Sequence, residues 1–220
     1  MTLAAILCAA YGADDTTGGH WDAARPTPSA PSMLDAADAV VVERIRSGDR
    51  GAFDALFLEH FAALRHFAAR YIGAASAAEI VSESFLRLWL ARETWAPRWT
   101  IRAYLYNTVR RLAIDGYRST RAERQRYATT LGPEEVWGMA SPTPSPESVV
   151  ETEATIALVW QAIRSLSEVQ QSVMALRWQA QLSWDEVASA VGMSAVAVRK
   201  QHSRALARLR ELLPAHLTDE

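Results

Sequence analysis

The 220-residue sequence contains one cysteine, Cys8, so it can form no internal disulfide and offers no cysteine-based zinc site. Its five histidines are too scattered to predict a metal cluster. No apolar run approaches the roughly 20 residues of a membrane-spanning helix. The apolar opening, residues 1–11, lacks a basic residue in front of it, and the first arginine is Arg25, which argues against a secretory signal. We therefore expect no cofactor, no metal, no direct membrane insertion and a cytoplasmic location.

Signatures of catalysis are missing as well. The sequence shows no paired carboxylates in a plausible site, no nucleophile elbow and no phosphate-cradling glycine loop. The alternation of apolar and polar residues that is typical of strands is also absent, whereas apolar residues recur at helical spacing. These absences disfavour an enzyme and predict an all-α fold.

Charge is distributed unevenly along the chain, although the net charge is only −2. Between Arg98 and Arg126 there are eight arginines against Asp115 and Glu123, a local balance of +6 (8 − 2). A second basic run, with five positive residues, lies between 194 and 210. Acidic residues are concentrated between these segments and in the early helices. Two basic segments separated by an acidic one indicate two contacts with nucleic acid.

The C-terminal segment 181–213 carries the signals of two helices joined by a tight turn. Ser183 and Glu186 have the spacing of a capping box, which starts a helix. Gly192 can adopt the left-handed conformation that often ends a helix, and Ser194 can cap the next one. The sequence therefore predicts a short helix, a turn and a longer helix.

The longer of these helices has one apolar stripe and is otherwise positive. Val198, Ala205 and Leu209 recur at helical spacing, and no acidic residue lies between Ser194 and Arg210. This layout is typical of a helix-turn-helix, which places the start of its second helix in the DNA major groove. An amphipathic hairpin with a solvated charged face is the alternative. The candidate DNA-contacting residues are Ser194, Ala195, Val196, Arg199, Lys200, Ser203 and Arg204.

The N-terminal half predicts four helices. The expected helices are 35–47, a second from a cap at Asp49 to about 72, a third opened by Ser76, and a fourth from 101 to about 119. The third leaves an outward face of acidic and apolar residues, which suits a protein partner better than solvent, although a solvated face is the alternative. This face consists of Glu79, Glu83, Leu86 and Trp89.

Pro97 marks residues 93–100 as a loop, and this loop holds Trp95 and Trp99 beside Arg98. Exposed aromatic rings next to arginine are suited to stacking unpaired bases, at about 1–3 kcal/mol per base. The alternative is that the tryptophans fold inward, and we expect at least one of them to do so in part. The helix after the loop is expected to expose a basic and aromatic ridge of Arg102, Tyr106, Asn107, Arg110, Arg111 and Arg118.

Composition divides the chain into two small helical domains and three connecting or terminal segments. Residues 12–34 are rich in glycine, proline and small polar residues, which predicts mostly disorder. Residues 141–148 are rich in proline and serine, which indicates a flexible linker. The expected parts are a 1–34 extension, a 35–119 domain, a 120–150 flexible linker, a 151–213 helix-turn-helix domain and a 214–220 tail.

Taken together, the two halves resemble a bacterial sigma factor of the short, two-domain extracytoplasmic-function (ECF) type. Residues 78–89 resemble the segment that docks on the RNA polymerase clamp, and residues 103–118 the helix that recognises and opens the minus-ten element. Residues 166–210 resemble the domain that recognises the minus-thirty-five element. The resemblance implies binding to core RNA polymerase and promoter DNA, and it makes an anti-sigma factor a candidate partner.

The resemblance also implies roles for individual residues. Polymerase binding falls on Glu79, Ser82, Glu83, Leu86 and Trp89. Minus-ten recognition and melting fall on Trp95, Arg98, Trp99, Arg102, Tyr106, Asn107, Arg110, Arg111 and Arg118. Minus-thirty-five recognition falls on the helix that begins at Ser194.

The chain departs from the family pattern in several places. Ser76–Glu79 stands where the family usually has Asp-Ala-Glu-Asp, and Ser82 replaces a common glutamine, which predicts fewer polar contacts with the clamp. Arg111 stands where asparagine is usual and Ala197 where threonine is usual, which predicts an unusual promoter preference.

A stand-alone helix-turn-helix regulator is the competing interpretation, with residues 35–119 as an oligomerisation or sensor domain. That interpretation predicts specific DNA binding by the purified chain alone. The sigma-factor interpretation predicts weak DNA binding until core polymerase is added.

Overall fold

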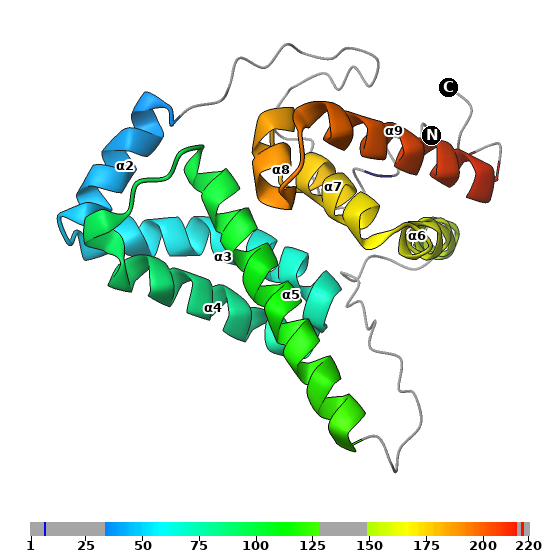
Figure 1. Cartoon of the computed structure of the whole chain (residues 1–220), viewed down its shortest axis with the longest axis horizontal. Helices are drawn as coiled ribbons and strands as arrows, with labels where there is room; N and C mark the ends of the chain where they lie inside the picture. Colours follow the sequence, from blue (N-terminus) through cyan, green and yellow to red (C-terminus); the bar gives the residue numbers. More distant parts are fainter. Residues whose placement is uncertain (1–6, 8–33, 128–148, 215–216, 218–220) are drawn as a thin grey trace. The chain divides into compact units, whose positions relative to one another are not determined.

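The computed structural model describes Leu7, residues 34–127, residues 149–214 and Leu217. Every regular element in these residues is helical, which confirms the predicted all-α class (Figure 1). The described residues form two compact units, one with helices α2 to α5 and the other with helices α6 to α9. Most of the predicted N-terminal extension, linker and tail lies outside the described residues.

The first unit has one helix start and one helix end that differ from the prediction. Gly73 ends α3 and has a φ of +80°, so the chain reverses there and α4 begins at once, which places Ser76 inside the first turn and not at the cap. Helix α5 continues past the predicted end near residue 119, because residues 120–127 contain neither glycine nor proline. The elements are α2 (Ala36–Arg46), α3 (Arg50–Ile72), α4 (Ala74–Leu90), the 3₁₀ helix η1 (Arg92–Thr94) and α5 (Ile101–Tyr127).

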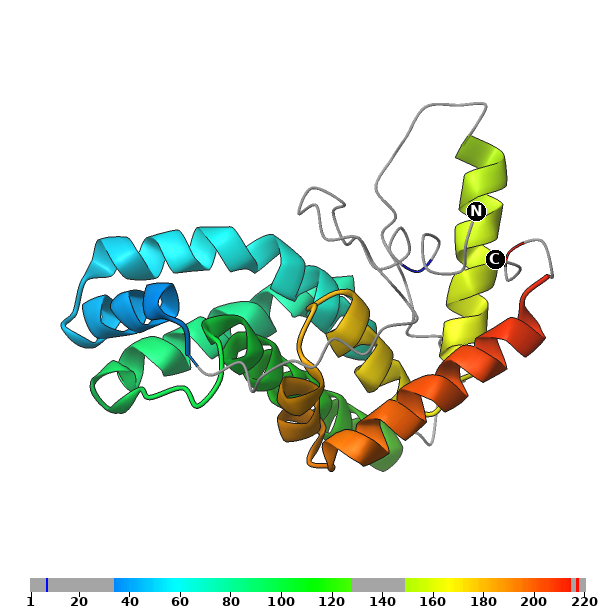
Figure 2. The same ribbon diagram turned by 90° about the horizontal axis from the view of Figure 1, so that it is seen from above.

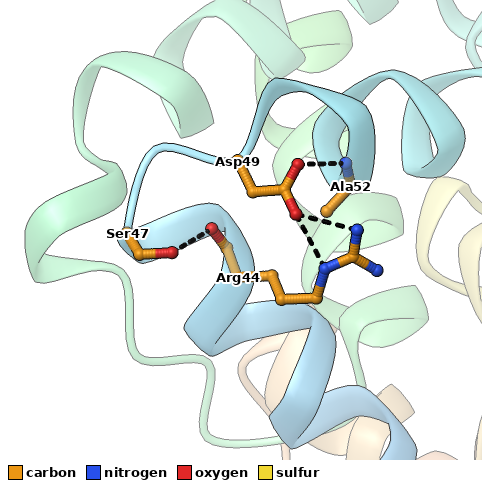
Figure 3. A network of polar contacts seen from close by, with 4 residues as sticks. All are labelled: Arg44, Ser47, Asp49 and Ala52. Atoms are coloured by element: carbon orange, nitrogen blue, oxygen red, sulfur yellow. Dashed lines mark hydrogen bonds and ion pairs between the residues drawn. The ribbon is translucent and has the colours of Figure 1, made fainter.

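The junction between α2 and α3 is held by one aspartate. Asp49 caps α3, as predicted, by accepting a hydrogen bond of 3.1 Å from the Ala52 N–H (Figure 3). Its other carboxylate oxygen accepts a bond of 2.8 Å from Nε of Arg44, at the end of α2. The Ala52 hydrogen bond, followed by the Arg44 side chain, holds the pKa of Asp49 below its usual value. Asp49 thus starts one helix and fastens the preceding one to it.

Helix α3 contacts both α4 and α5 and supplies aromatic rings to the core of the first unit. Phe57 packs on Phe85 of α4 with ring centroids 5.0 Å apart, and Phe67 packs on Tyr106 of α5 at 4.9 Å, both edge to face. Figure 2 shows the long α3 running beside α4 and α5. Leu64, Phe67 and Leu88 are completely buried. Phe57 and Phe67 therefore join α3 to α4 and to α5 through ring contacts.

The second unit is organised around α7, which contacts both helices of the helix-turn-helix. A capping box between Ser167 and Gln170 opens α7. Val173, Met174 and Leu176 are fully buried on it. The elements of this unit are α6 (Val149–Arg164), α7 (Glu168–Trp178), α8 (Trp184–Val191) and α9 (Ala195–Leu212).

Candidate nucleic-acid interface

The turn between α8 and α9 has the geometry that the sequence predicted. Ser183 Oγ accepts from the Glu186 N–H at 3.3 Å, and the Glu186 carboxylate accepts from the Ser183 N–H at 2.8 Å. Gly192 ends α8 in the left-handed conformation with a φ of +70°. Ser194 Oγ accepts from the Ala197 N–H at 3.2 Å and so starts α9. Both helix ends of the turn therefore have hydrogen-bond partners within the turn.

Helix α9 buries one stripe and exposes the predicted DNA-contacting residues. Val198, Ala205 and Leu209 are completely buried against the rest of the unit. Val196 is 74% exposed although it is apolar. Ser194, Arg199, Lys200, Ser203 and Arg204 are exposed and Ala195 is half-buried, so the first half of α9 offers a polar and positive surface. This surface can contact base edges and phosphates at once.

A tryptophan beneath this surface contacts two guanidinium groups. The Trp184 ring centroid lies 4.4 Å from Cζ of Arg177 and 6.0 Å from Cζ of Arg199. Arg177 is held in turn by a short hydrogen bond from Nη1 to the Leu182 carbonyl. This support was not predicted from the sequence, although the tryptophan that directly follows the cap residue Ser183 was a usable signal.

His202 lies between two tryptophan rings on the inner side of α9. Its ring is stacked on Trp178 with centroids 6.5 Å apart and meets Trp184 edge to face at 5.0 Å. Burial, followed by the nearby charge of Arg177, lowers the pKa of His202 to about 4. The imidazole is therefore neutral at neutral pH and acts as a packing group.

The second basic surface lies on α5 and is smaller than predicted. Arg102 and Arg111 are exposed, whereas Asn107 and Arg110 are half-buried. Tyr106 was expected on the outer ridge, but it is 3% exposed because it packs on Phe67. Arg118 belongs to α5, but its side chain lies outside the described part of the chain.

The loop before α5 separates its two tryptophans. Trp95 is 4% exposed and packs on Tyr104 with ring centroids 5.5 Å apart, so its ring is not available to stack a base. This confirms that at least one tryptophan turns inward and corrects the use of Trp95 as a base platform. Trp99 is half-buried, and Cζ of the exposed Arg98 lies 5.5 Å from its ring centroid.

The outward face of α4 keeps most of its predicted residues accessible. Glu79 and Ser82 are exposed, and Leu86 is 51% exposed. Leu90, which the sequence analysis missed, is 70% exposed and lies one turn after Leu86, a spacing that signalled the same face.

Two members of this α4 face are partly engaged within the unit. Glu83 pairs with Arg87 at 2.6 Å. Trp89 packs on Phe53 with ring centroids 4.9 Å apart, and Cζ of Arg92 lies 4.8 Å from its ring. The surface is therefore an apolar pair of leucines with an acidic margin, flanked by a partly covered tryptophan.

These surfaces define a class of protein. A capped helix-turn-helix with a positive outer face, and a separate basic helix preceded by an arginine–tryptophan pair, are typical of a DNA-binding protein. Among the described residues there is no group of three or more metal-ligating side chains. In that same part of the chain, no helix is both long and apolar enough to cross a membrane.

Comparison with protein families identifies the group within that class. The model for Sigma-70 region 2 matches residues 56–123, and the model for Sigma-70, region 4 matches residues 162–211. The chain belongs to the ECF type of the sigma-70 family, a group of non-enzymatic polymerase subunits. It binds RNA polymerase and promoter DNA and directs promoter-specific initiation of transcription.

Individual relatives cover both halves of the chain. The RNA polymerase sigma factor CnrH of Cupriavidus metallidurans is 29% identical over 81% of this chain and 95% of its own length. Its structure in complex with the cytosolic domain of CnrY matches with a TM-score of 0.58, at 26% identity over 81% of this chain and 98% of that one. The ECF RNA polymerase sigma factor BldN of Streptomyces coelicolor is 32% identical over 79% of this chain and 65% of its own length.

A second solved structure shares the fold. The sigma factor RpoE from Bartonella quintana, in complex with the anti-sigma factor NepR, matches with a TM-score of 0.59 at 20% identity, over 73% of this chain and 95% of that one.

Proposed function

We propose that the first half of α9 recognises the minus-thirty-five element. The supporting observation is the outer surface of this helix, where Arg199, Lys200 and Arg204 are exposed while the opposite stripe is fully buried. Arginine can bond bidentately to guanine in the major groove, and lysine and serine can bond to phosphates or bases. The remaining members of this site are Ser194, Ala195, Val196 and Ser203.

The minus-ten element is captured by the loop before α5 in this proposal. Arg98 and Trp99 lie together and offer a cation and a ring face to an unstacked base. Arg102, Asn107, Arg110, Arg111 and Arg118 hold the flanking duplex. Opening the duplex costs a few kcal/mol per unstacked step, and capture of a flipped base offsets this cost.

The outward face of α4 docks on RNA polymerase in this proposal. Leu86 and Leu90 supply apolar area, and Glu79, Ser82 and Glu83 supply a polar margin. Trp89 contributes only its accessible edge because Phe53 and Arg92 cover part of its ring. The clamp contact is then mainly apolar, in keeping with the reduced acidity of the α4 start.

The same proposal extends to the organisation of the whole chain. The unit that ends with α5 at Tyr127 and the unit that begins with α6 at Val149 act as two promoter-binding domains, and the segment between them acts as their linker. Residues 1–34 and 214–220 act as terminal segments. Linking the two domains raises their joint affinity for a promoter that carries both elements. We place the protein in the cytoplasm, and the complex of RpoE with NepR supports an anti-sigma factor as a further partner.

The upstream assignment is tested by Arg199→Ala in transcription with core polymerase on promoters randomised at the upstream element. We expect a loss of roughly 1–3 kcal/mol that is confined to one base-pair position. Arg208→Ala is the matched control, because Arg208 lies on the same helix and is paired with Glu211 at 2.8 Å. An equal loss of transcription on all sequences would show that Arg199 contacts a phosphate. No loss would contradict the role of α9 as the recognition helix.

A further inference from the structure

The first residue of α5 donates a hydrogen bond to a side chain of α2, a helix that is distant in sequence. The Ile101 N–H donates to Oδ2 of Asp38 at 2.8 Å, across 63 residues of sequence. In the same turn, the Ala103 N–H donates to Oγ1 of Thr100 at 3.2 Å. The first amides of a helix need acceptors, and a carboxylate there also meets the positive end of the helix dipole. Asp38 of α2 therefore completes the cap of α5.

The environment of Asp38 indicates that this contact is specific. Burial, partly countered by the Ile101 hydrogen bond, raises the pKa of the Asp38 carboxyl above its usual value. The neighbouring charged or titratable groups are Asp35, Glu59 and His60, and His60 also senses Arg102. A partly buried carboxylate is costly without a partner, so the amide of Ile101 is the contact that keeps it in place.

Helix α2 contacts the loop of residues 95–100 at both of its ends, and the Asp38 hydrogen bond is one of these two contacts. At the far end of the loop, η1 contacts α2 as well. Residues 95–100, with Arg98 over Trp99, therefore run between two points that are both held by α2. Helix α2 itself lies outside residues 56–123, which match region 2.

We propose that Asp38 is a positioning residue for promoter opening. By fixing the Ile101 end of the loop, it sets where Arg98 and Trp99 stand relative to the duplex that α5 holds. This inference rests on the proposed role of the loop in minus-ten capture. It assigns to α2 a function in strand opening, in addition to its packing on α3.

The test compares Asp38→Ala with Asp38→Asn in holoenzyme assembled with core polymerase. The asparagine oxygen can still accept from the Ile101 N–H, whereas alanine cannot. We expect Asp38→Ala to lower permanganate reactivity of the minus-ten thymines by about tenfold, and Asp38→Asn to stay within about threefold of the parent. Co-elution with polymerase and binding to the upstream element should be unchanged, and a premelted promoter should restore transcription.

Asp35→Ala is the matched control, because Asp35 caps α2 through the Asp38 N–H at 2.7 Å and is not the carboxylate that accepts from Ile101. If Asp35→Ala reduces opening as much as Asp38→Ala, or if Asp38→Ala opens normally, the inference is wrong. Asp38→Ser, which is polar but too short to bond Ile101, must show the same defect if the alanine variant does not fold. Arg98→Ala separates the role of the loop in minus-ten capture from the positioning role of Asp38. Normal opening by Arg98→Ala would contradict the role of the loop itself.

Discussion

His202 is a titratable residue packed between the rings of Trp178 and Trp184 in the helix-turn-helix unit. Its pKa is lowered from 6.5 to about 4 by burial and by Arg177, so the folded state binds a proton less readily than the unfolded chain. The stability that this residue contributes is therefore complete above pH 6.5 and is lost as the pH falls toward 4.

Replacing His202 with phenylalanine should remove this component of the pH dependence. We expect the parent protein to lose about 3 kcal/mol more than the variant between pH 7 and pH 4, because only the parent must protonate a buried imidazole. Denaturant unfolding of both proteins at several pH values measures this difference in stability. Hydrogen exchange of the amides of α7 to α9 shows whether the difference lies in the second unit. If the stability of the two proteins changes with pH in the same way, the pKa of His202 is not lowered as stated.

Two aromatic residues illustrate what sequence cannot decide at the residue scale. Trp95 and Tyr106 both have arginines nearby in the sequence. Such aromatic residues can lie either on a surface that binds nucleic acid or in the core. The packing of Trp95 on Tyr104, and of Tyr106 on Phe67, turns both inward. The partner rings lie on other turns or other helices, so no local pattern contains this information.

At the scale of the elements, two glycines should respond to alanine in opposite directions. Gly192 has a φ of +70°, which a side chain makes unfavourable even though the space around it is open, so Gly192→Ala should destabilise the second unit by about 1 kcal/mol. Gly116 lies inside α5, and an added Cβ would meet Ile80 Cδ1 at an ordinary 3.7 Å, so Gly116→Ala should stabilise the first unit by up to about 1 kcal/mol.

Hydrogen exchange of the full chain reports the two units separately and thus checks both variants at once. The Gly192 effect should appear in α7 to α9 and the Gly116 effect in α3 to α5. Effects of the same sign would contradict the conformations described for these positions.

Element boundaries were predictable where the signal was local. Asp49, Ser183 and Ser194 all cap the helices that the sequence predicted they would start. Ser76 was wrong as a helix start because Gly73 allows α4 to follow α3 without a gap. The part that Asp38 plays in the cap of α5 was not predicted because Asp38 is 63 residues away from Ile101.

At the scale of the whole molecule, association with polymerase should depend on one face of α4. Leu86→Asp should lower co-elution with core polymerase by at least about tenfold, because it places a charge in the centre of an apolar contact. Leu58→Asp on α3 is the matched control, since Leu58 is 76% exposed but belongs to a different helix. Size-exclusion chromatography with core polymerase measures both, and equal behaviour of the two variants would exclude α4 as the docking face.

The sequence by itself determined the helical class, the capped helix-turn-helix, the two basic segments and the family, because caps, helical periodicity and charge runs are properties of neighbouring residues. Only the tertiary structure decided that Trp95 and Tyr106 are core residues, that Trp184 contacts Arg199, and that Asp38 accepts from the first amide of α5. Each of these contacts joins residues that belong to different elements of the chain. Such pairs are selected by the packing of whole helices, which local sequence does not encode.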